Sequence, residues 1–112
     1  MKRLMSSSWP FNDPPNVAVF ANRKVIFDRA WISYVTHDLD DGSWQFHCDQ
    51  TEEITEDDIA IVSLKNILDK DQSIADLADL PLGWRAWRPA KDAPWQRLGI
   101  ILYEICRSGI TV

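Results

Sequence analysis

Alternation of apolar and polar residues is clearest between residues 31 and 48. Residues 31–37 and 43–48 both alternate, and the five-residue loop 38–42, which is rich in Asp and ends in Gly, separates them. This pattern predicts two half-buried strands joined as a hairpin. A loop of that length places His37 opposite Ser43, which gives one apolar face and one polar face. The other expected pairs are Thr36 with Trp44, Tyr34 with Phe46, and Ile32 with Cys48.

Three shorter apolar runs predict further buried strands, at residues 17–21, 59–62 and 84–88. Asn22, Ser63 and Asp71 are residue types that cap helix N-termini. We therefore expect short helices over residues 23–26, 64–68 and 73–78. Pro81 and Gly83 then force a sharp turn into the last strand.

These elements predict a single α+β domain, with an antiparallel sheet of about five strands and short helices on one face. A length of 112 residues suits one domain. We expect an extended lead-in at 1–16, with Trp9 and Phe11 against the body, and the α+β domain at 17–97. Residues 98–112 form an apolar extension. Three alternatives remain open for this extension: an added strand, a short helix on the sheet, or a patch that pairs with a second copy.

Charge is distributed unevenly along the chain. The net charge of −5 argues against nucleic acid as a partner. No Lys or Arg lies between Arg29 and Lys65, and that gap holds nine of the seventeen acidic residues. Four basic residues gather later in the chain, at Arg85, Arg88, Lys91 and Arg97.

Compartment signals favour a soluble cytoplasmic protein. The first eight residues lack the apolar run of a signal peptide. The most apolar stretch, residues 98–105, is far shorter than the ~20 residues of a membrane span. Two cysteines, Cys48 and Cys106, are too few for a disulfide scaffold and favour reduced thiols.

Catalytic, cofactor and metal sites are not indicated by any motif. The chain has no nucleophile elbow, no phosphate-binding glycine loop and two histidines in all. The Asp-rich loop at 38–42 does not match the spacing of a calcium-binding loop. In the expected register His37 and His47 lie ~13 Å apart, too far for one metal ion. We expect a protein that is not an enzyme.

The six tryptophans suggest one candidate ligand site. Arginines alternate with tryptophans near residues 84–88, a pattern that suits cation–π stacking on a ligand. The candidate residues are Trp44, Trp84, Arg85, Trp87 and Arg88. The alternative is that bulky aromatics fill the core of a small domain.

Several short motifs follow one another along the chain in an order that is typical of a known family. They are Tyr34-Val35-Thr36 before an acidic loop, Trp44-Gln45-Phe46, Val62-Ser63-Leu64 leading into Ile67, Asp71 to Ile74, and Leu80-Pro81-Leu82-Gly83 followed by Ala86 and Arg88. In this the chain resembles a bacterial domain of unknown function that is also classed as an immunity-protein family of polymorphic toxin systems. It departs from that pattern at Ser43, which separates Gly42 from Trp44, and at His47-Cys48-Asp49, where glycine is usual.

The resemblance implies a non-catalytic protein that neutralises a toxin by covering its surface. Clustered carboxylates would steer a basic partner toward it. The expected partner-binding residues are Asp38, Asp40, Asp41, Glu52, Glu53, Glu56, Asp57 and Asp58. Two other functions remain open: a small-ligand or regulatory module at the Trp/Arg residues, and a self-associating subunit that dimerises through residues 98–112.

Overall fold

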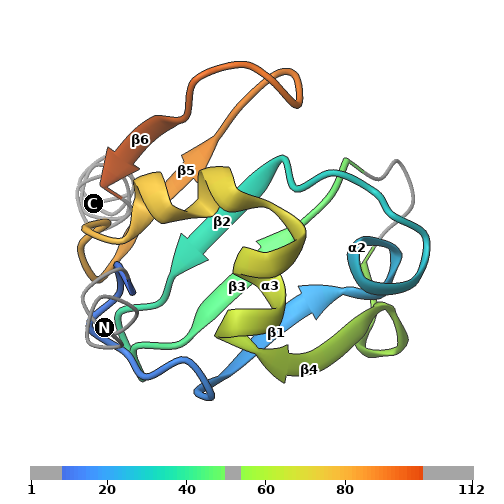
Figure 1. The fold of residues 1–112 in the computed structure, drawn as a ribbon, viewed down its shortest axis with the longest axis horizontal. Coiled ribbons are helices and arrows are strands. Elements are labelled where there is room, and N and C mark those ends of the chain that lie inside the picture. The colour runs from blue at the N-terminus through green and yellow to red at the C-terminus, as the bar shows by residue number, and fades with distance from the viewer. Residues whose placement is uncertain (1–8, 50–53, 100–112) are drawn as a thin grey trace, which may run out of the picture.

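The computed structural model describes residues 9–49 and 54–99, which form a mixed six-stranded sheet with short helices (Figure 1). In chain order the elements are β1 (Ala18–Asn22), α2 (Arg23–Phe27), β2 (Tyr34–His37), β3 (Trp44–His47), η1 (Glu56–Asp58), β4 (Ile59–Ser63), α3 (Leu64–Lys70), η2 (Gln72–Leu77), β5 (Trp84–Trp87) and β6 (Gln96–Gly99). The strand order across the sheet is β4-β1-β3-β2-β5-β6. The predicted α+β class is therefore confirmed.

The sheet differs from the prediction in strand number and direction. It has six strands rather than about five, and β1 runs parallel to β3, whereas the other neighbouring strands are antiparallel. The parallel pair arises because β3 inserts between β1 and β2 after the hairpin turn. Strand β6 begins at Gln96, two residues before the predicted extension, and its first three residues are exposed, so no buried apolar pattern marks where it starts. Leu98 and Gly99 of the predicted extension belong to β6, and residues 100–112 lie outside the described part.

The predicted helix caps are confirmed. Asn22 Oδ1 accepts a hydrogen bond from Lys24 N at 2.8 Å, and Ser63 Oγ accepts one from Asn66 N at 3.1 Å. Asp71 Oδ1 accepts a hydrogen bond from Ser73 N at 3.0 Å and so begins η2, a 3₁₀-helix. Each cap satisfies an amide that has no partner within its own helix, and together they set where the helices begin.

The hairpin register is shifted by one residue from the predicted one. His37 pairs with Trp44 and Val35 with Phe46, because Asp38 N donates to Ser43 O at 2.8 Å and shortens the loop. Since side chains alternate with a period of two, the shift reverses the faces of β2. Val35, rather than Tyr34, is therefore buried beside Phe46.

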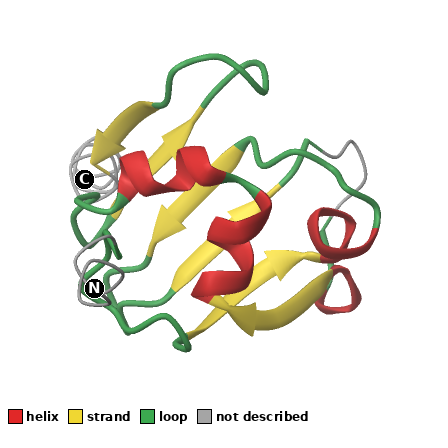
Figure 2. Cartoon of the chain, in the orientation of Figure 1, coloured by secondary structure: helices red, strands yellow, loops and turns green. Residues whose placement is uncertain are grey.

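The core lies between the sheet and the helices α3 and η2, which cover one face of it (Figure 2). Leu64 and Ile67 of α3 and Ile74 and Leu77 of η2 are fully buried there. From the lead-in, Phe11 packs edge-on against Trp44, with ring centroids 5.4 Å apart. The predicted packing of Phe11 against the body is thus confirmed, and Trp9 packs against the same core. No helix in the described ranges has the length and apolar character needed to cross a membrane.

Replacing Gly83 with Ala tests how β5 is started. Gly83 has φ 83°, and Trp84 N bonds to Pro81 O, so Gly83 holds the third position of a tight turn where side chains are strained. We expect Gly83→Ala to lower the free energy of unfolding by about 1–2 kcal/mol. Urea denaturation measures the loss. Leu82→Ala in the same turn is the control, and an equal loss in both variants would contradict this account.

Candidate functional site

The described acidic residues between positions 38 and 58 lie at two opposite ends of the sheet. Asp38, Asp40 and Asp41 are in the β2–β3 loop, where β3 begins. Strand β4 is antiparallel to β1 and β1 is parallel to β3, so η1 and the start of β4 lie where β3 ends. In Figure 1 the β2–β3 loop is at the left of the sheet, and α2 with the start of β4 is at the right. The described acids therefore do not make one surface.

The β2–β3 loop is held in shape by its own acidic side chains. Asp38 Oδ2 accepts hydrogen bonds from Gln45 Nε2 at 2.7 Å and Ser43 Oγ at 3.2 Å. Asp41 Oδ1 accepts one from Ser43 N at 3.0 Å, and this bond lowers the pKa of Asp41. Asp40 makes no such contact and is exposed. The loop is ordered before any partner binds.

Two exposed leucines accompany these acids. Leu39 in the loop is 53% exposed and Leu82 in the turn before β5 is 46% exposed. The loop and turn are close, because a methyl group placed on Gly42 would lie 3.8 Å from Leu82 Cδ2. We call residues 38–43 and 81–83 the hairpin end.

A shallow pocket of about 360 Å³ adjoins the hairpin end. His37, Trp44 and Leu80 line it, together with the carboxylates of Asp13 and Asp79. His37 donates from Nδ1 to Leu80 O at 2.7 Å and stacks on Trp44, with ring centroids 3.9 Å apart. Both contacts fix the imidazole, so the wall of the pocket is rigid.

The acids at the other end have a different local role. Asp58 Oδ2 accepts hydrogen bonds from Thr55 N at 2.9 Å and Thr55 Oγ1 at 3.2 Å, which caps η1. Glu56 and Asp57 are exposed beside it. Glu52 and Glu53 fall outside the described residues.

The predicted Trp/Arg ligand site is not assembled. Trp44 is buried in the core, where its Nε1 donates to Asp13 Oδ2 at 2.9 Å. Alternation along β5 puts Trp84 on the face of buried Ala86 and puts Arg85 and Trp87 on the opposite face. Arg85 there donates to Tyr34 Oη at 3.2 Å. The candidate residues on the sheet thus divide between its core face, which carries Trp44 and Trp84, and the opposite face, which carries Arg85 and Trp87.

Arg88 instead belongs to a buried network that the sequence motifs did not indicate. Its side chain is 1% exposed, and it donates to Asp71 Oδ2 at 2.6 Å, Ser73 Oγ at 2.9 Å and Ile32 O at 2.9 Å. The guanidinium lies 4.2 Å from the Trp95 ring centroid and 5.7 Å from that of Trp31. Its acceptors come from two segments that are far apart in the sequence, the one before β2 and the one at the start of η2, so their convergence appears only in the fold.

Burial raises the pKa of Asp71, but hydrogen bonds from Ser73 and Arg88 outweigh that effect and leave the pKa below its usual value. Asp71 is therefore ionised at neutral pH and neutralises Arg88. Both carboxylate oxygens of Asp71 already accept hydrogen bonds within this network, Oδ1 from Ser73 and Oδ2 from Arg88.

His47 and Cys48 lie at the end of β3. Gln45 donates its amide to Asp38, so Gln45 Oε1 faces His47 and accepts from His47 Nε2 at 3.1 Å. The Nδ1 atom is buried without a partner. Burial lowers the pKa of His47, against a smaller opposing effect of Asp38. Cys48 is a buried free thiol, and burial raises its pKa. In the described ranges no three His, Cys, Asp or Glu side chains gather as a metal site.

Comparison with known proteins returns no match: no family model fits the sequence, and no curated protein or solved structure is significantly similar. The resemblance to the immunity-protein family therefore stays a prediction.

Asp71→Ala tests the buried pair. It leaves the Arg88 guanidinium buried without a counter-charge, and we expect the free energy of unfolding to fall by about 3–5 kcal/mol. Lys65→Ala is the control, because it breaks an exposed ion pair with Asp69 that is worth at most ~1 kcal/mol. Urea denaturation compares them. Similar losses in the two variants would show that the buried pair contributes little.

His47 gives a pH prediction. Its pKa is lower in the folded chain than the ~6.5 of an unfolded histidine, so the unfolded state binds more protons below about pH 6.5. Stability should therefore decline as pH falls through that value toward the lowered pKa. We expect His47→Gln to flatten the decline between about pH 7.5 and 5.5. Urea titrations across this range measure it, and identical slopes in both proteins would refute the assignment.

Proposed function

We propose that this is a non-catalytic binding protein that docks a basic protein partner at the hairpin end. The observation that carries the proposal is the placement of two exposed leucines, Leu39 and Leu82, among the carboxylates of a loop held by its own hydrogen bonds. Apolar centres with a charged rim are the usual composition of protein interfaces.

The two kinds of side chain have separate effects on binding. Full burial of a leucine side chain contributes roughly 1.5–3 kcal/mol, so Leu39 and Leu82 supply affinity. Asp38, Asp40 and Asp41 supply long-range attraction, which raises the rate of encounter with a basic surface and weakens in salt. Because Asp38 and Asp41 already order the loop, little conformational entropy is lost on docking.

An immunity-type role is consistent with this mode of binding. Blocking a basic toxin needs a surface that covers it and no chemistry, and it places the protein in the cytoplasm with that toxin. The resemblance described above is the link to toxin neutralisation. Neither a nucleic-acid partner nor a membrane partner is part of this proposal. Self-association through residues 98–112 stays a prediction, because residues 100–112 lie outside the described part.

Charge reversal at matched sites tests the proposal. Asp40→Lys and Asp57→Lys change the net charge equally, but only Asp40 lies at the hairpin end. The tagged full chain is used to isolate a stoichiometric partner from its host lysate, and the binding rates of both variants to that partner are then measured. We expect Asp40→Lys to slow association about tenfold at low salt. Asp57→Lys should leave it within about twofold.

Leu39→Ser distinguishes the apolar contribution to affinity from the electrostatic contribution to the association rate. It should speed dissociation while leaving the association rate unchanged. A partner that binds both charge variants equally and tolerates Leu39→Ser would exclude the hairpin end as the docking surface.

A further inference from the structure

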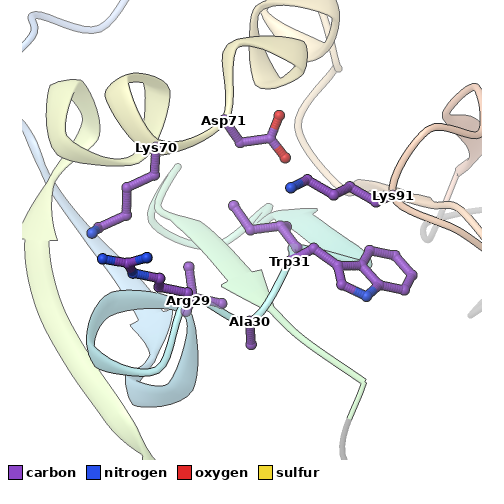
Figure 3. Close-up of a pocket in the computed structure, with 8 residues that line it drawn as sticks. Arg29, Ala30, Trp31, Lys70, Asp71 and Lys91 are labelled. Atoms are coloured by element: carbon purple, nitrogen blue, oxygen red, sulfur yellow. The ribbon is translucent and has the colours of Figure 1, made fainter.

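A second, chemically different site lies away from the hairpin end, where β2 begins and β5 ends. It is an open pocket of about 260 Å³ (Figure 3). Three segments build it: α2 with its connection to β2, the junction of α3 with η2, and the β5–β6 loop. Val25, Ala30 and Ile32 give it an apolar side, and Trp31 lies at its edge.

Each segment contributes one cation to this pocket. The cations are Arg29, Lys70 and Lys91. Figure 3 shows the Arg29 guanidinium and the Lys70 ammonium in one corner, with the Lys91 ammonium reaching in from the other side. Among the described residues none of the three forms an ion pair, and the one polar contact they have is a long one, 3.4 Å from Lys70 Nζ to Ile26 O. In a chain with net charge −5, this convergence is a local reversal of sign.

The one carboxylate that lines the pocket does not cancel this charge. Asp71 is already bonded to Arg88 and Ser73, so it neutralises Arg88 rather than the three pocket cations. Lys91 also borders a neighbouring hollow that contains Asp76 and Asp92, and it pairs with neither of them. The pocket therefore has three cationic side chains that can bind a ligand.

The backbone at Arg29 is unusual. Arg29 has φ 61°, a left-handed conformation that non-glycine residues rarely adopt. Asp28 N and Ala30 N both donate to Lys24 O, at 2.9 and 3.0 Å, which ends α2 and fixes this conformation. Glycine is the usual residue at this position after a helix. Arginine at this position places a guanidinium at the pocket, whereas glycine would adopt the same backbone conformation with less strain.

We infer that this pocket binds a small phosphate-bearing anion of the phosphomonoester class. Arginine and lysine together suit phosphate, because a guanidinium can donate two parallel hydrogen bonds and an ammonium acts as a point charge. The volume lies below the 300–1,000 Å³ of drug-sized sites, so the ligand has few heavy atoms. The site is independent of the proposed partner surface, since the two lie at opposite ends of β2.

Calorimetric titration of the full chain with inorganic phosphate, glycerol 3-phosphate and succinate tests this inference. We expect saturable 1:1 binding of both phosphates, and weaker binding of succinate. Lys70→Gln and Lys91→Gln should each weaken phosphate binding about tenfold, because each loses one charge-assisted hydrogen bond. Lys65→Gln is the matched control, since it changes the net charge equally on the same helix as Lys70 and lies outside the pocket.

Arg29→Gly separates binding from folding. Glycine relieves the backbone at φ 61°, so the melting temperature should stay unchanged or rise while phosphate affinity falls. Three results overturn the inference: no saturable binding of either phosphate, equal weakening by Lys65→Gln and Lys70→Gln, or full affinity in Arg29→Gly.

Discussion

A guanidinium that is almost completely buried requires hydrogen-bond acceptors, and the fold around Arg88 supplies one for each of its three nitrogen atoms. Arg88 directly follows β5. It donates hydrogen bonds to Ile32 O before β2, to Ser73 in η2, and to Asp71 at the junction of α3 with η2. Burying such a charge is tolerated only with a partner and complete hydrogen bonding. These bonds therefore fix how three segments meet, and two of the three cation-bearing segments of the phosphate pocket are among them.

The order of the strands has an equally large effect on surface chemistry. Strand β3 crosses the sheet between the β2–β3 loop and η1, and the pairing of β4 with β1 keeps η1 at the far end, so the two segments lie at opposite ends of the sheet. One acidic run in the sequence thus becomes two separate groups of carboxylates. The group in the β2–β3 loop adjoins Leu39 and Leu82, which gives it the composition of an interface. The three cations of the proposed phosphate pocket also come together from distant parts of the chain.

Local chemistry was predictable, and long-range juxtaposition was not. Asn22, Ser63 and Asp71 cap the helices they were expected to cap, because capping needs only residues within a few positions. The hairpin strands lie within the predicted ranges 31–37 and 43–48, but β2 is shorter than predicted and pairing of Asp38 with Ser43 shifted the register by one. Arg88 was expected to contact a ligand, whereas Asp71 and Ser73 hold it inside the fold. Nothing in the sequence pattern marks Arg29, Lys70 and Lys91 as neighbours.

A double-mutant cycle between Asp71→Asn and Arg88→Gln tests most directly whether this buried pair organises the structure. Urea unfolding of the wild-type chain, both single variants and the double variant gives the coupling free energy between the two side chains. We predict a coupling of about 2–3 kcal/mol, the upper range for contacting residues in one network. Additive losses, with a coupling below about 0.5 kcal/mol, would contradict the claim and reduce Arg88 to an independently buried side chain.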